Sequence, residues 1–127
     1  LLPVASERRH ADFLRRCGVE MIIGGHPHVV QPLRLTSDRY APGRVTVYSL
    51  GNLISNMKTR DTRGGAMAEV RLRRDSVGKA YVDTAFYHLV YTVPPSGAQR
   101  NFAVMPIDSV PSQWAGRARA FQSALKP

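Results

Sequence analysis

One stretch of the chain decides the fold: residues 19–28, with the sequence VEMIIGGHPH. Its first five residues are short and nearly all apolar, which is typical of a buried strand in a parallel or mixed sheet. Just before it, residues 7–17 are predicted to form a helix that Ser6 caps and Gly18 ends. The inward face of that helix is expected to hold Ala11, Leu14 and Phe13. A helix, a glycine turn and a buried strand make half of a layered α/β unit.

The rest of the chain is predicted to supply strands and a second helix. In chain order we expect a polar turn over 37–43, a strand over 45–50, a mobile charged loop over 56–65, a hairpin of strands 66–74 and 80–93, and a helix over 112–125. The last helix has an apolar stripe at helical spacing, formed by Trp114, Ala118, Phe121 and Leu125. We predict two parts, a sheet-forming part over 1–93 and a Pro-rich tail with the helix over 94–127.

Length and composition limit the class of protein. The 127 residues suit one domain, and a 43% hydrophobic content favours a folded chain. No apolar run approaches the ~20 residues of a membrane-spanning helix. The lone Cys17 excludes an internal disulfide and a cysteine-built zinc site. Because the chain starts Leu1-Leu2, without Met, we expect it to be a fragment of a longer protein.

The charge balance favours anionic partners. Eighteen Lys and Arg against nine Asp and Glu leave a net charge of +9. The cations are spread along the chain, however, and no nucleic-acid-binding motif accompanies them. The first interpretation is therefore that these cations are solvated charges on the surface of a basic protein. The second is that they bind an anionic ligand, and nucleic acid is an unexpected partner.

His26-Pro27-His28 is the segment that points to chemistry. It follows a strand, where sites of α/β sheets collect, and neutral imidazole is a common ligand of transition metals. Gly25 and its neighbouring glycine permit a sharp turn and the close approach of a ligand. If the segment is extended, both rings start on the same side and can bind one metal ion or two neighbouring ions. The alternative is that these are solvated loop histidines.

Asn52 ends the second predicted strand in a similar way. Its amide can present an oxygen to a cation or an NH₂ group to an anion. The alternative, which we favour from the residues alone, is that Asn52 tolerates a left-handed turn. His88 is expected to be packed within the sheet, and no role is assigned to His10.

Two blocks resemble the CapA-type family of bacterial capsule and poly-γ-glutamate synthesis proteins, whose domain is similar to calcineurin-like metallophosphoesterases. They are VEMIIGGHPHVVQP at residues 19–32 and YSLGNL at residues 48–53. The resemblance implies an α/β fold, with this chain as the C-terminal portion of a two-sheet metallophosphoesterase-like sandwich flanked by helices. The family's other ligands belong to upstream motifs that these 127 residues lack, so the missing N-terminal half of the same domain is an expected partner.

The resemblance also implies residue roles. His26 and His28 match a GHxH-like motif and are the expected catalytic and metal-binding residues, with Gly25 and Asn52 lining the site. The implied cofactors are divalent metal ions, two of them, with Mn, Fe or Zn as candidates. The implied function is capsule or poly-γ-glutamate biosynthesis by metal-assisted hydrolysis of a phosphoester or amide-like bond, in the extracytoplasmic cell envelope. The fragment alone is expected to be inactive. The alternative is a non-catalytic basic envelope module that binds or guides an acidic polymer.

Overall fold

The computed structural model describes residues 1–38 and 41–125 and has a mixed α/β fold. Its described part contains two three-stranded sheets, two α-helices and two short 3₁₀-helices. In chain order these are α1 (Ala5–Arg16), β1 (Met21–Ile23), β2 (Leu33–Asp38), β3 (Ala41–Val47), η1 (Arg60–Thr62), β4 (Gly64–Arg74), β5 (Ala80–Val93), β6 (Ala103–Pro106), η2 (Ile107–Ser109) and α2 (Ser112–Ala124). The α/β class predicted from the sequence is confirmed.

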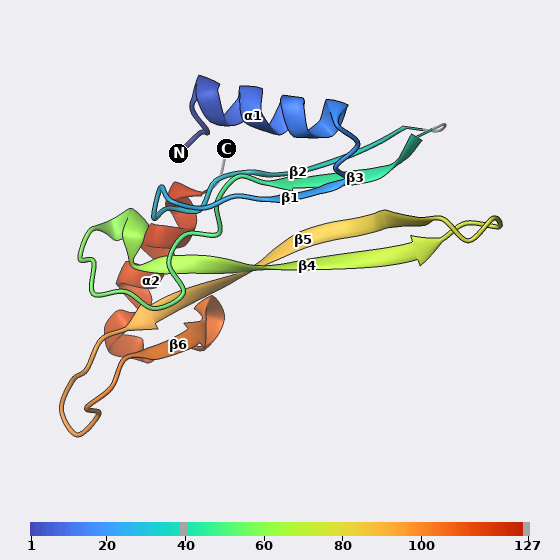
Figure 1. Cartoon of the computed structure of the whole chain (residues 1–127). Helices are drawn as coiled ribbons and strands as arrows, with labels where there is room; N and C mark the ends of the chain where they lie inside the picture. Colours follow the sequence, from blue (N-terminus) through green and yellow to red (C-terminus); the bar gives the residue numbers. More distant parts are fainter. Residues whose placement is uncertain (39–40, 126–127) are drawn as a thin grey trace.

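The first sheet has the strand order β1-β3-β2 and lies between α1 and the long β4–β5 hairpin (Figure 1). β1 is parallel to β3, with Met21 opposite Val45, whereas β2 is antiparallel to β3. The sheet is therefore mixed. The carboxyl ends of the parallel pair β1 and β3 lie at the same edge of the sheet, and the histidine segment starts there.

The β4–β5 pair confirms the hairpin predicted over residues 66–74 and 80–93. The strands pair antiparallel from Gly64 opposite Tyr91 to Arg74 opposite Ala80. β6 adds to the other side of β5 and gives the order β4-β5-β6. In the turn, Asp75 Oδ1 accepts hydrogen bonds from the backbone N–H groups of two residues further along the turn. This is the usual way in which an Asx side chain closes a turn.

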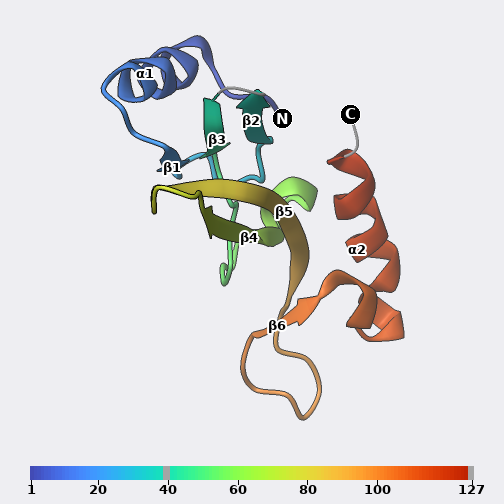
Figure 2. The ribbon, with the colours of Figure 1, turned by 90° about the vertical axis from the view of Figure 1, so that its right-hand side faces the viewer.

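Two buried clusters hold these layers together. Val45 and Val47 of β3 pack against Val82 of β5, which joins the two sheets. Tyr91 of β5 and Phe121 of α2 are the centre of the second cluster, and both are at most 1% exposed. Figure 2 shows α2 alongside the curved end of β5, so the predicted apolar stripe of this helix is confirmed.

The start of the chain departs from the prediction in three ways. α1 begins at Ala5, so Ser6 lies inside the helix, and Glu7 Oε2 instead accepts a hydrogen bond from the N–H of Val4 at 2.7 Å. Of the three residues expected to face inward only Ala11 is buried; the other two, Leu14 and Phe13, are exposed. The helix is held to β3 partly by a polar contact, in which the Arg15 guanidinium donates to Thr46 Oγ1.

Two further predictions need correction. β1 is an edge strand rather than a buried one, and Ile23 is 59% exposed. Residues 56–65, predicted to be a loop, include the 3₁₀-helix η1, and the predicted mobility of this segment stays a prediction. Thr62 of η1 is buried, and its Oγ1 lies 2.7 Å from Thr59 Oγ1. The predicted turn over 37–43 centres on residues 39–40, which lie outside the described residues. Neither α1 nor α2 is long and apolar enough to cross a membrane.

Candidate functional site

His26 and His28 follow β1 at the carboxyl edge of the first sheet. Both side chains are exposed, and their ring centroids lie 6.5 Å apart with the ring planes inclined at 45°. The rings are therefore neighbours within one short loop. The metal-binding and catalytic roles of His26 and His28 remain predictions.

The backbone of this loop is not extended, which corrects one expectation. His26 has φ 96° and His28 has φ 58°, and in the described chain they are the only residues other than glycine with positive φ. A positive φ is uncommon for residues with a side chain and is a source of local strain, of order 1–3 kcal/mol for each residue. Pro27 sits between them with its own φ restricted by the ring. The rings are thus brought together by two left-handed residues rather than by strand alternation.

The two glycines before the loop have different roles. Gly24 lies against β3: its N–H donates to the carbonyl of Val47 at 2.7 Å, and an added Cβ would lie 2.4 Å from the carbonyl oxygen of Tyr48. Gly25 has no heavy atom within 4 Å of the same position. Gly24 therefore needs to be glycine for its close approach to β3, which places the start of the histidine loop beside that strand. The close approach of a ligand at Gly25 stays a prediction.

Asn52 lies on the segment that follows β3, and its side chain contacts the histidine loop. Its Oδ1 lies 2.8 Å from His28 Nδ1, and its Nδ2 donates to the carbonyl of Thr62 at 2.9 Å. Asn52 is 9% exposed, whereas His28 is exposed. The left-handed residue of this turn is Gly51, with φ 69°, so the interpretation that Asn52 itself takes up the left-handed conformation is wrong. The contact with His28 agrees with the expectation that Asn52 lies near the histidines.

The segment around η1 is the part of the site that the sequence did not indicate. Thr62 offers its carbonyl to Asn52, and Met57 Sδ lies 3.4 Å from the same amide nitrogen. Asp61 lies next to Thr62, but its carboxylate is bonded to Arg60, which lowers the pKa of Asp61. No local pattern in the sequence could have indicated that a backbone carbonyl from this charged segment holds Asn52.

The donor set fits transition metal ions but is incomplete. Two imidazoles are suitable ligands for Zn, Fe or Mn, yet such ions take four to six ligands. In the part of the chain that the structure describes, no group of three or more His, Cys, Asp or Glu side chains is arranged to hold a metal. Any ion at His26 and His28 therefore needs further ligands from outside these residues.

The other titratable candidates lie elsewhere. His88 is exposed on β5 rather than packed within the sheet, and its Nε2 lies 2.9 Å from Glu69 Oε2, which lowers the pKa of Glu69. His10 is exposed on α1, and Cys17 is an exposed free cysteine at the end of that helix. None of them contacts the His26–His28 loop through a hydrogen bond of the described residues.

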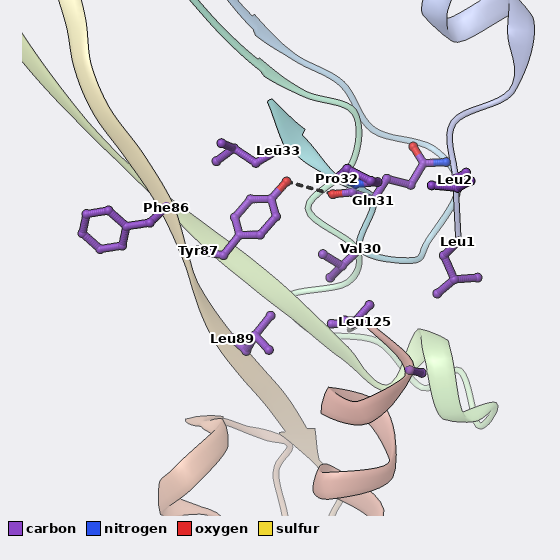
Figure 3. A pocket seen from close by; sticks show the side chains of 11 residues that line it. Leu1, Leu2, Val30, Gln31, Pro32, Leu33, Phe86, Tyr87, Leu89 and Leu125 are labelled. Atoms are coloured by element: carbon purple, nitrogen blue, oxygen red, sulfur yellow. Dashed lines mark hydrogen bonds between the residues drawn. The ribbon is translucent and has the colours of Figure 1, made fainter. Parts of the chain in front are cut away.

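An apolar cavity of about 510 Å³ has no histidine in its lining (Figure 3). Its wall is formed by Leu1, Leu2, Val30, Gln31, Pro32, Leu33, Phe86, Tyr87, Leu89, Ala124 and Leu125. Tyr87 donates its hydroxyl proton to the carbonyl of Gln31 at 2.9 Å, and burial raises the pKa of Tyr87 to about 12. The lining brings together no metal ligands or nucleophiles, so the histidine loop is the stronger candidate for chemistry.

Comparison with known proteins points to one family. The family model described as "Bacterial capsule synthesis protein PGA_cap" matches residues 2–57, which include the histidine loop and Asn52. The chain is 28% identical over 92 residues to "PGA biosynthesis protein CapA" of Bacillus subtilis (strain 168). That match covers 72% of this chain and 23% of the relative, so the chain spans about a quarter of the length of the curated protein it matches. No solved structure matches.

Proposed function

The chain belongs to the CapA-type family of bacterial capsule synthesis proteins, and from that membership we propose that it contributes His26 and His28 to a metal-dependent hydrolase active in capsule or poly-γ-glutamate biosynthesis. The observation that carries the proposal is the placement of the two rings. They lie 6.5 Å apart at the carboxyl edge of a parallel strand pair, on a backbone with two left-handed residues. Strained backbone of this kind clusters at functional sites.

The residues of this chain would bind and orient the ions. The close approach of Gly24 to β3 and the restricted φ of Pro27 limit the movement of the loop, so less conformational entropy is lost when both rings bind. When bound, divalent ions supply a Lewis acid and an activated water for hydrolysis of a phosphoester or amide-like bond. The proposed ions number two, with Mn, Fe or Zn as candidates.

The free edge of β1 supports the proposal that the remaining ligands come from further polypeptide. β1 pairs only with β3 among the described strands, and its Met21 and Ile23 are 38% and 59% exposed. An exposed apolar edge strand is a template for pairing with another strand. A strand added here in the parallel direction would end at the same edge as His26 and would bring its own side chains to the ions.

Elemental analysis of the purified protein, together with the further polypeptide proposed to supply the remaining ligands, tests the metal proposal. We expect the wild type to retain a divalent metal. The metal content of the variants His26→Ala and His28→Ala should fall by at least about tenfold, because loss of a residue that only supports a ligand already costs about 10–100-fold in metal affinity. His10→Ala and His88→Ala are matched controls, because both remove an exposed imidazole away from the loop, and they should retain the metal. A metal-free wild type, together with unchanged capsule production in the double variant His26→Ala/His28→Ala, would show the proposal to be wrong.

A second function is favoured by one observation, the net charge of +9. Exposed arginines lie on three elements: Arg8, Arg9 and Arg16 on α1, Arg71, Arg73 and Arg74 on β4, and Arg117 and Arg119 on α2. Acidic side chains offset part of this charge, as where Asp83 lies 3.0 Å from Arg73. In this alternative the chain is a non-catalytic envelope module that binds an acidic polymer. Binding of poly-γ-glutamate that weakens steeply with salt and survives a chelator would favour it over the hydrolase.

A further inference from the structure

Asn52 has a defined amide orientation because its two ends have different partners. The NH₂ group of an asparagine only donates hydrogen bonds, and its carbonyl oxygen only accepts them. The Nδ2 atom lies 2.9 Å from the carbonyl oxygen of Thr62, which accepts. Turning the amide over would place its oxygen against that carbonyl, and two acceptors cannot bond to each other. Oδ1 must therefore face His28.

The amide orientation sets the position of the proton on His28. Oδ1 of Asn52 lies 2.8 Å from His28 Nδ1 and can only accept, so Nδ1 must carry the hydrogen. A neutral imidazole has one N–H group, and the other nitrogen then holds a free lone pair. In His28 that nitrogen is Nε2.

We propose that Asn52 is a positioning residue that holds His28 in the Nδ1–H tautomer and so presents the Nε2 lone pair to a ligand. The identity of that ligand as a divalent metal rests on the proposed function; the tautomer does not. Metal-binding histidines usually donate their second N–H to such a partner, and loss of the partner typically costs about 10–100-fold in metal affinity. Asn52 suits this role because it is 9% exposed and bonded at both ends, whereas the ring it holds is exposed.

Nuclear magnetic resonance of the chain labelled with ¹⁵N-histidine tests the tautomer directly. At a pH about two units above the ordinary histidine pKa of ~6.5, long-range ¹H–¹⁵N correlations distinguish the two tautomers of a neutral ring. We expect His28 of the wild type to show the Nδ1–H form alone. An Nε2–H form, or an exchanging mixture, would overturn the proposal without any variant.

Variants separate positioning from general stability. Asn52→Leu removes the acceptor and should let His28 exchange between tautomers. Asn56→Leu is the matched control, because Asn56 is an exposed asparagine of the neighbouring loop, and it should change nothing. If Asn52→Leu keeps the wild-type signal of His28, Asn52 does not position the ring.

Titration with Zn²⁺ by calorimetry, on the protein together with the further polypeptide proposed to supply the remaining ligands, links the tautomer to the site. Asn52→Leu is expected to bind Zn²⁺ about 10–100-fold more weakly than the wild type, and Asn56→Leu is expected to bind equally well. A wild type that shows the Nδ1–H form but binds no metal refutes the proposed function and leaves the positioning role in place. Equal Zn²⁺ affinity in the wild type and Asn52→Leu, with an Nε2–H signal, refutes the positioning role and leaves the metal site.

Discussion

Replacing Gly24 with alanine is expected to destabilise the end of β1 and the histidine loop. The added Cβ would lie 2.4 Å from the carbonyl oxygen of Tyr48 and 3.4 Å from that of Val47, where 3.4 Å is an ordinary contact. The Tyr48 carbonyl would have to retreat by about 1 Å (3.4 minus 2.4), although Tyr48 is 8% exposed and Val47 is fully buried. Overpacking of this kind costs about 1–3 kcal/mol of unfolding free energy.

The same substitution also strains a hydrogen bond. The N–H of Gly24 donates to the Val47 carbonyl at 2.7 Å, and weakening such a bond costs up to about 1 kcal/mol. We therefore expect Gly24→Ala to lower the free energy of unfolding by about 2 kcal/mol. For a chain of this length the loss corresponds to a decrease in Tm of roughly 6–10 °C.

Gly25→Ala is the matched control, one residue further along. A Cβ at Gly25 meets no heavy atom within 4 Å, and its φ is not positive. Alanine there should leave stability unchanged or raise it by up to about 1 kcal/mol, because it restricts the unfolded chain. Urea denaturation followed by circular dichroism measures both variants. Equal midpoints for Gly24→Ala and Gly25→Ala would refute the reasoning, since only one of these glycines touches β3.

Two further stability predictions concern the β5 layer and its contacts. Phe121→Ala should lower the free energy of unfolding by about 3–5 kcal/mol, because Phe121 is fully buried. Phe86 is half-exposed, so Phe86→Ala should lower it by less than about 1 kcal/mol. Equal losses for the two variants in thermal unfolding would contradict the assignment of the core. Tyr87→Phe should cost about 1 kcal/mol near neutral pH, because it removes the hydrogen bond to Gln31. The folded pKa of Tyr87, about 12, lies above the unfolded value of ~10, so this contribution is complete below pH 10 and is lost as the pH rises toward 12. Denaturation at stepped pH should therefore show the advantage of the wild type over Tyr87→Phe shrinking across that interval, and a constant difference would contradict it.

Local patterns were sufficient for the elements whose burial repeats along the chain. The alternation in 66–74 and the long return strand over 80–93 predicted the β4–β5 hairpin, and the helical stripe that includes Phe121 predicted α2. In α2 the residues that predicted the helix also form its buried face. In β4 the alternation predicted the strand but not a buried face, because Leu72 is 59% exposed. A second kind of local pattern, two glycines and two histidines directly after an apolar strand, indicated the candidate site.

Local sequence patterns could not predict that β1 lies at the edge of its sheet. An apolar run is read as buried, but whether a strand is central or at an edge depends on how many neighbours the topology provides. In the described chain β1 has one neighbour, β3, and Ile23 is largely exposed. The inward face of α1 was misjudged for a similar reason, because part of the contact between α1 and β3 is the polar bond from Arg15 to Thr46.

The amino-acid order alone was enough to place His26 and His28 after a strand and to indicate the capsule synthesis family, since both depend on residues adjacent in the chain. The hydrogen-bond partners of Asn52, in contrast, were decided only by the tertiary structure. Its bond to His28 spans 24 positions and its bond to Thr62 spans 10, and neither pairing leaves a periodic trace in the sequence. The parallel alignment of β1 with β3 brings the two strand ends to one edge, and that alignment makes Asn52 the hydrogen-bond partner of His28.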